Sequence, residues 1–331
     1  MTDIQPTIEN VIPVGATWCQ TGRRVALATL VYVDGSAPRP RGSQMVIAED
    51  GEYFGYLSGG CAEHAIADVG RQVFQHERPV AVRFGTGSPY VDIQLPCGSG
   101  IDVHFVRPLA DVFAHVADRL ARRESVALDI GVASGVVALA AGERPPAAHY
   151  RRHYRPPIQL FVAGAGPVAI ELVRLAATQG IVTTLASPDE ATLRAADART
   201  SLSFWDARQL DAISVDADTA VVTAFHEHDR ELAVWQRFAA EPVFYRGALG
   251  SRRAHAQRCA ALANLGVPAA SVARIHGPAG LATGGKSAGE IALSILAELY
   301  VEYRREAQPE LSWSGGTLID NPNAEQTATT R

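Results

Sequence analysis

The segment Ser58-Gly59-Gly60-Cys61-Ala62-Glu63 carries residue types suited to chemistry. Two consecutive glycines let the backbone turn tightly, and apolar residues at helical spacing over 62–75 predict that a helix follows. Cys61 is therefore expected in the first turn of that helix, where the helix dipole lowers the pKa of a thiol. Such a thiolate would bind a soft metal or react with sulfur. A buried and inert Cys61 is the alternative interpretation.

A second cysteine, Cys97, lies in the glycine-rich segment Pro96-Cys97-Gly98-Ser99-Gly100. Cys97 is a candidate to join Cys61 across a pocket, an arrangement that would also suit a zinc or redox protein. The chain has four cysteines, and no two of them have Cys-x-x-Cys spacing, which excludes a zinc ribbon and a thioredoxin motif. We expect no chemical role for Cys19 or Cys259, which lie in amphipathic or polar stretches.

Two rigid arginines lie in the loop that runs from Asp34 to Gly42. Ser36, Arg39 and Arg41 stand beside prolines in this loop, and guanidinium groups on a rigid backbone suit the capture of phosphate. A solvated loop without a ligand is an equally good interpretation of these residues. Ser36 and Arg39 are therefore retained as candidate binding residues.

The glycine turn Gly164-Ala165-Gly166 follows the apolar run 158–162 and precedes an apolar helix expected over 167–179. This is the context that the dinucleotide-binding pattern G-x-G-x-x-G/A requires, with Ala169 in the third position. Gly164 permits the tight turn, and Gly166 lets the backbone approach an anion at the start of the helix. The turn is expected to bind a phosphate, although a strand–helix turn without a ligand remains open.

The residues after the next strand do not complete a dinucleotide site. An acidic residue at the end of that strand normally binds the ribose hydroxyls, but the run 181–186 ends at Ser187-Pro188. NAD(P) is therefore the less favoured ligand. Another glycine turn, with Gly250, Ser251 and Arg252, leads into a helix and should border the same sheet edge, where ligands bind in such folds.

Strands alternate with helices throughout the second half of the chain, and this order predicts a doubly wound parallel sheet. The first half mixes short strands and helices. We therefore predict an α/β protein with a mixed N-terminal domain (residues 1–150), a Rossmann-like domain (residues 151–305) and a disordered polar tail (residues 306–331).

The bulk composition narrows the class of protein further. A net charge of -5 disfavours a general nucleic-acid or anionic-membrane binder. No apolar run approaches the ~20 residues that a membrane span needs. The first residues lack the basic start and apolar core of a signal peptide. We expect a cytoplasmic protein that binds neither nucleic acid nor membrane.

Taken together, the motifs resemble the XdhC/CoxI family of molybdoenzyme maturation factors. The resemblance runs in family order from about residue 25 to 300 and rests most on the Gly-Gly-Cys-x-Glu segment and on Gly247-Ala248-Leu249-Gly250-Ser251-Arg252. It also includes Gly35-Ser36-Ala37-Pro38-Arg39, Leu95-Pro96-Cys97-Gly98 and the Gly164 turn.

The resemblance implies a chaperone without turnover of its own. Such a protein would bind molybdenum cofactor (molybdopterin) transiently, protect it while a partner cysteine desulfurase installs the sulfido ligand, and deliver it to a xanthine dehydrogenase-type apoenzyme. The family also implies a homodimer. Cys61 matches the family cysteine expected to contact the metal of the cofactor, and the N-terminal domain would be of the XdhC/CoxI type. A nicotinamide-dependent oxidoreductase that uses the Rossmann-like domain is the main alternative.

Overall fold

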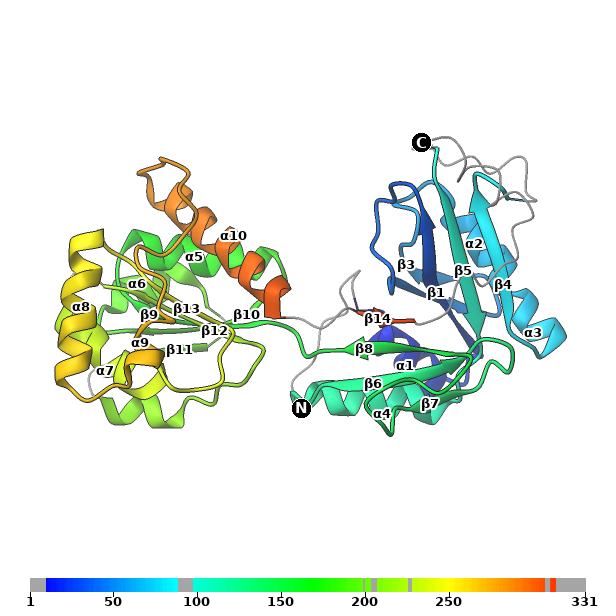
Figure 1. Ribbon diagram of the computed structural model, residues 1–331, viewed down its shortest axis with the longest axis horizontal. Helices are drawn as coiled ribbons and strands as arrows, with labels where there is room; N and C mark the ends of the chain where they lie inside the picture. The colour runs from blue at the N-terminus through cyan, green and yellow to red at the C-terminus, as the bar shows by residue number, and fades with distance from the viewer. Residues whose placement is uncertain are drawn as a thin grey trace. The chain divides into compact units, whose positions relative to one another are not determined.

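The structure, a computed structural model, describes residues 10–88, 98–198, 200–203, 207–225, 228–306 and 310–313. The chain divides into two compact units, of which the first comprises Met1–Pro156 together with Gln308–Arg331 and the second Pro157–Ala307. The second unit is therefore an insertion in the sequence of the first. Each unit combines helices with sheets (Figure 1), which confirms the expected α/β class.

The first unit contains a five-stranded sheet in the order β3-β2-β1-β5-β4 with antiparallel neighbours. Its strands are β1 (Val25–Asp34), β2 (Gln44–Ala48), β3 (Tyr53–Gly55), β4 (Val80–Gly85) and β5 (Gly100–Val106). One face packs against α2 (Glu63–Gly70) and α3 (Gln72–His76). The other face shares a core with α1 (Ile12–Gln20), α4 (Ala110–Ala121) and a second sheet.

The second sheet of this unit has the order β14-β8-β6-β7 and is antiparallel. Its strands are β6 (Val126–Gly131), β7 (Val137–Leu139), β8 (His149–Tyr154) and β14 (Leu311–Ser312). Strand β8 crosses the domain boundary expected after residue 150, and its pairing with β6 extends the first unit to Pro156. The expectation of a wholly disordered tail was wrong for Leu311–Ser312, because this segment pairs with β8.

The second unit has a parallel sheet in the order β11-β10-β9-β12-β13, and an isolated parallel bridge joins Gly247 to His276 beyond β13. This is the strand order of a Rossmann fold. The strands are β9 (Gln159–Gly164), β10 (Val182–Ser187), β11 (Thr200–Ser203), β12 (Thr219–Ala224) and β13 (Tyr245–Ala248). Among the described residues, no helix has the length and apolar character that crossing a membrane requires.

Helices cover both faces of this parallel sheet (Figure 1). The core on one face includes α5 (Pro167–Thr178), α6 (Glu190–Ala196) and α10 (Ala288–Glu306). The core on the other face includes η1 (Ala207–Ala212), α7 (His228–Phe238), α8 (Arg252–Asn264) and α9 (Ala269–Val272). Burial on two sides explains why the central strands are continuous apolar runs rather than alternating ones.

Polar side chains join the two sheets of the first unit across its core. Gln44 Nε2 donates to Thr29 Oγ1 at 3.0 Å, and the Tyr154 hydroxyl donates to Gln44 Oε1 at 2.9 Å. All three residues are buried. Buried polar groups that satisfy one another fix a single arrangement of the elements that carry them. This network therefore fixes the position of β8 relative to β1 and β2.

A buried histidine, His104 on β5, belongs to the same core. Its Nε2 lies 3.0 Å from the carbonyl oxygen of Val132, and its Nδ1 lies 3.1 Å from the Tyr150 hydroxyl. A carbonyl oxygen only accepts, so Nε2 carries the proton and Nδ1 accepts from Tyr150. Burial lowers the pKa of His104 to about 4. The ring is therefore neutral in the folded protein at pH 7.

We predict that the first unit loses stability as the pH falls from about 6.5 to about 4. In this window the unfolded chain protonates His104 and the folded chain does not, so the free energy of unfolding falls by about 1.4 kcal/mol per pH unit. Calorimetry across the window measures this slope. The His104→Gln variant should lose the larger part of it, and an unchanged slope in that variant would contradict the assignment.

Candidate functional site

Three loops of the first unit meet at one edge of the five-stranded sheet. Asp34 at the end of β1 pairs with Gly100 at the start of β5, which also pairs with Gly85 at the end of β4. At the other side of the sheet, Gly55 at the end of β3 pairs with Met45 near the start of β2. The loops over residues 35–43 and 56–62 and the segments 86–88 and 98–99 therefore start or end at the same edge.

Close contacts connect these loops. A Cβ placed on Gly59 would lie 3.1 Å from Cβ and Cγ of Pro38, and one on Gly35 would lie 3.6 Å from Ser99 Cβ. Gly59 also has a φ of +78°, so a side chain at this position would be both crowded and strained. In the structure, the segment that contains Ser36 and Arg39 therefore lies next to the Gly59–Cys61 turn. No spacing in the sequence predicts this contact.

The carboxylate of Glu63 holds the Gly-Gly-Cys loop from the inside. Glu63 Oε1 accepts from the N–H groups of Leu57 at 3.1 Å and Ser58 at 2.8 Å. Glu63 Oε2 accepts from the Ser58 hydroxyl at 2.7 Å and the Ala62 N–H at 3.3 Å. Although burial opposes ionisation, these hydrogen bonds lower the pKa of Glu63. With only 3% of its surface exposed, Glu63 supports the loop rather than facing solvent.

Cys61 is exposed at the end of this loop. The alternative that Cys61 is buried was therefore wrong. The expected position in the first helical turn was also wrong, because Ala62 is the N-cap and α2 begins at Glu63. Gly60, with a φ of +104°, has open space where a side chain would stand. The loop therefore presents the thiol beside an uncrowded stretch of backbone.

The two other predicted residues of this region, Ser36 and Arg39, lie on the neighbouring loop. Ser36 is exposed and Arg39 is half-buried. Cys97 lies outside the described residues, although Gly98 and Ser99 directly after it belong to this edge: the Thr86 hydroxyl donates to the Gly98 carbonyl at 3.0 Å. The structure therefore tests neither the pairing of Cys97 with Cys61 nor its place in a pocket.

A buried ion pair beneath this edge escaped the sequence analysis. Arg83 on β4 donates to Asp102 on β5 at 2.6 and 3.2 Å, and its guanidinium lies 3.6 Å from Asp34 at the end of β1. The carboxylate of Asp102 raises the pKa of Arg83. Only the pairing of β4 with β5 brings Arg83 and Asp102 together, so no local motif in the sequence indicates this ion pair.

In the second unit, the predicted glycine turn joins β9 to α5. The N–H of Ala165 donates to the Ala224 carbonyl of β12 at 3.1 Å, and the N–H of Gly166 donates to the Thr192 hydroxyl at 2.9 Å. Pro167 at the start of α5 has no N–H. The turn therefore offers an anion fewer free N–H donors than the motif alone predicts.

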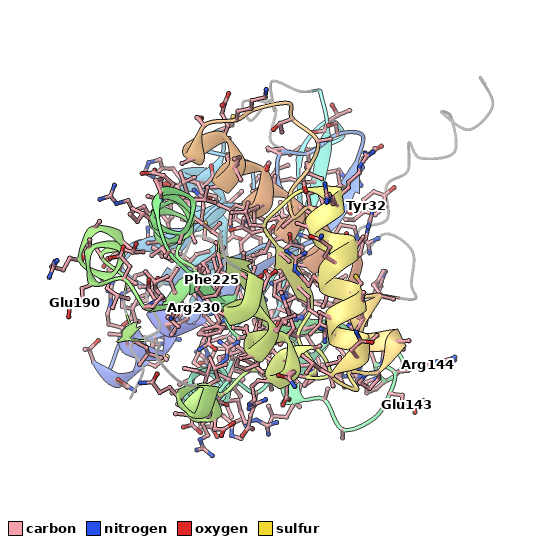
Figure 2. All side chains as sticks on the ribbon, turned by 90° about the vertical axis from the view of Figure 1, so that its left-hand side faces the viewer. Tyr32, Glu143, Arg144, Glu190, Phe225 and Arg230 are labelled. Carbon is pink, nitrogen blue, oxygen red and sulfur yellow. The ribbon has the colours of Figure 1, made fainter. Side chains whose placement is uncertain are left out.

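The position that binds ribose in dinucleotide folds is also occupied by internal contacts. Strand β10 ends at the fully buried Ser187. Asp189 caps α6 by accepting from the N–H groups of Ala191 at 3.1 Å and Thr192 at 3.0 Å. Figure 2 shows the next acidic side chain, Glu190, at the periphery and directed outward. The geometry therefore agrees with the sequence in giving NAD(P) little support.

The second glycine turn, at the end of β13, leads into α8. Gly250 has a φ of +136°, and Ser251 caps the helix through its hydroxyl, which accepts from the Ala254 N–H at 3.1 Å. Arg252 is exposed in the first turn of α8. Because β12 alone separates β9 from β13, the two glycine turns end strands about 10 Å apart at the same sheet edge.

A buried cluster behind this turn was missed by the sequence analysis. Arg258 Nε donates to Glu231 Oε1 at 2.9 Å, and both side chains are fully buried. Arg258 Nη2 also donates to the Leu249 carbonyl at 2.8 Å, which ties the pair to the turn. Cys259 lies 3.5 Å from His255 Nε2. Arg258 and Glu231 come from different helices, so their spacing carries no signal.

Two stretches of the chain match models of described protein families. Residues 160–299 match a model described as the XdhC Rossmann domain, and residues 18–85 match one described as the XdhC and CoxI family. The molybdenum cofactor insertion chaperone PaoD of Escherichia coli (strain K12) is 34% identical over 284 residues, 84% of this chain and 83% of that protein. The chain belongs to the XdhC and CoxI family.

Two further proteins share this similarity along most of the chain. A protein of Bacillus subtilis (strain 168) described as a probable xanthine dehydrogenase subunit is 25% identical over 323 residues, 85% of this chain and 94% of that protein. A crystal structure of a xanthine dehydrogenase from Bacillus halodurans has a TM-score of 0.72 and 23% identity, and covers 90% of this chain and 96% of that one. The latter similarity supports the two-unit fold of the family.

Proposed function

We propose that this chain is a carrier of molybdenum cofactor that has no turnover of its own. It binds the cofactor, protects it while a partner cysteine desulfurase installs the terminal sulfido ligand, and passes it to a xanthine dehydrogenase-type apoenzyme. The observation that supports this role is the exposed thiol of Cys61 on a loop that Glu63 fixes from the inside. Membership in a family that includes a molybdenum cofactor insertion chaperone supports molybdenum cofactor as the cargo. We also propose a cytoplasmic homodimer.

The residues around Cys61 suit the proposed cargo. The cysteine sulfur is a soft ligand for a metal, and the loop holds it in place before the cargo arrives. Ser36 and Arg39, on the loop that contacts Gly59 through Pro38, supply a hydroxyl and a guanidinium for the polar part of the pterin. These groups bind and orient the cargo, and none of them transfers a proton in the proposal.

The Rossmann unit contributes a second set of candidate binding residues. Gly164 and Gly166 shape the turn at the start of α5, and Gly250, Ser251 and Arg252 form the turn two strands away. We propose that these turns bind an anionic group of the cargo or of a partner. A nicotinamide-dependent oxidoreductase is less well supported. The Gly166 N–H donates to the Thr192 hydroxyl and the Asp189 carboxylate caps α6, so these groups are already used within the unit.

The test is anaerobic incubation with excess molybdenum cofactor, desalting, and assay of bound molybdenum and of the fluorescence of the oxidised pterin. We expect about one cofactor per chain in the wild type, and binding weakened about tenfold or more in Cys61→Ala. Cys259→Ala, a half-buried cysteine in the other unit, is the matched control and should bind like the wild type. Saturable NADH binding without any pterin would overturn the proposal.

A further inference from the structure

Strand β14 is a packed part of the first unit although it follows the Rossmann unit in the chain. Leu311 pairs with Arg152 of β8 and is only 8% exposed in the core that includes α1 and α4. The ring of Trp313 meets the ring of Tyr150 edge-on, with 6.3 Å between centroids. The His153 N–H donates to the Glu310 carbonyl at 2.9 Å. Residues 310–313 thus complete the edge of the second sheet.

The same strand touches the end of the loop that joins β1 to β2. A Cβ on Gly42 would lie 3.1 Å from Glu310 Cβ and 3.2 Å from Leu311 Cβ, so the backbone of the loop lies directly against β14. Arg152 Nε donates to the Gly42 carbonyl at 2.7 Å, and its Nη2 lies 3.3 Å from Glu310 Oε2. Arg152 is 6% exposed, so its side chain is shielded from water at this junction.

From Gly42 the contacts continue to the Cys61 loop. The Gly42 N–H donates to the Leu30 carbonyl at 2.8 Å, and Arg41 Nε donates to the Val31 carbonyl at 2.9 Å. These bonds fix one end of the loop against β1. Nearer its other end, Pro38 lies against Gly59. Contacts at Gly42 and Arg41, the short stretch of chain over residues 38–41, and the contact of Pro38 with Gly59 therefore link β14 to the Gly59–Cys61 turn.

We propose that β14 is a positioning element of the Cys61 site. By holding Gly42 and Arg152, it keeps the loop over residues 35–43 where Pro38 supports the Gly59–Cys61 turn. The site-bearing unit is consequently incomplete without residues that come after the Rossmann unit in the sequence. The contacts alone support the claim that β14 holds the backbone of the site in place. Any effect of β14 on cofactor retention rests on the proposed function.

Hydrogen exchange in three chains tests this proposal: the full chain, a chain ending at Glu306 and a chain ending at Trp313. Without β14, the amides of residues 40–43 and 57–62 should exchange about tenfold faster, because local opening there becomes easier. Exchange over residues 100–106 of β5 should stay within about twofold, since these amides report global unfolding. The chain ending at Trp313 retains β14 and should match the full chain. A peptide of residues 307–331 added to the shortest chain should restore slow exchange.

Two outcomes would overturn the proposal: unchanged exchange at residues 40–43 and 57–62, or equal acceleration over β5, which would indicate general destabilisation. If the shortest chain does not fold, Leu311→Ser in the full chain tests the same contact, and it should accelerate the same amides. Cofactor retention is measured on the same samples. If exchange is accelerated in the shortest chain but the full chain binds no cofactor, the proposed function is refuted and the positioning role of β14 stands.

Discussion

Replacing Glu63 by alanine is expected to lower the free energy of unfolding of the first unit by about 3 kcal/mol, because several buried donors lose their acceptor at once. The N–H groups of Leu57 and Ser58 and the Ser58 hydroxyl all donate to this carboxylate, which is only 3% exposed. The Gly-Gly-Cys loop should also lose its fixed shape, so cofactor binding should weaken about tenfold or more even though Cys61 remains.

Glu63→Gln separates shape from charge. The amide retains an oxygen acceptor but presents an N–H₂ group to other donors, so this variant should fall between the wild type and Glu63→Ala. Calorimetry of the first unit and the pterin assay measure the two effects. Glu302→Ala, a change to a carboxylate of the other unit, is the control. Wild-type stability and binding in Glu63→Ala would contradict the role of Glu63 as loop support.

The lowered pKa of Glu63 fixes the direction of its pH dependence. The unfolded chain takes up a proton at a higher pH than the folded chain, so the stabilisation is complete above the unfolded pKa of about 4.3 and is lost as the pH falls through the lower folded value. This window lies below the one predicted for His104. The two groups can therefore be distinguished by the pH range in which the free energy of unfolding of each variant depends less on pH than that of the wild type.

Removal of the Arg258 guanidinium is expected to have the largest effect on the second unit. Arg258→Ala leaves the carboxylate of Glu231 fully buried without its ion-pair partner, which costs about 3–5 kcal/mol. In a unit of this size the loss lowers the midpoint of thermal unfolding by about 10 °C. The bond to the Leu249 carbonyl is lost as well, so the Gly250 turn should become mobile.

The control for this variant is Arg194→Ala in the same unit. Arg194 pairs with Glu190 at 3.3 Å, but both side chains are 74% exposed, and such a pair contributes about 0.5 kcal/mol or less. The double variant Glu231→Leu with Arg258→Met removes both buried charges and should recover much of the loss. Equal calorimetric midpoints for Arg258→Ala and Arg194→Ala would show that the buried pair contributes nothing.

The parts of this fold that were predicted correctly from the sequence are those marked by local motifs. The glycine turn at Gly164 needs a preceding apolar strand and a following helix, and all three features lie within one short stretch of chain. The missing acidic residue after β10 was likewise visible at Ser187. The family resemblance rested on similar local segments, and the match of residues 18–85 and 160–299 to the family models confirmed it.

Contacts between distant segments escaped prediction for a physical reason. The Arg83–Asp102 and Glu231–Arg258 pairs, and the contact of Pro38 with Gly59, depend on strand pairing and helix packing that no spacing encodes. The return of Leu311 to the first unit was missed because a two-residue strand in a polar tail has no periodicity to detect. Cys61 lay outside the predicted helical turn because helix boundaries are the least certain feature of a sequence pattern.

The most direct test of the proposed function is X-ray absorption at the molybdenum edge of the anaerobic complex, compared between the wild type and Cys61→Ser. Serine preserves the size of the side chain and removes its sulfur. If Cys61 holds the cofactor, the wild-type spectrum will contain one more sulfur neighbour of molybdenum than the Cys61→Ser spectrum. Identical sulfur coordination in the two complexes at equal occupancy would contradict the assignment of Cys61 as the ligand.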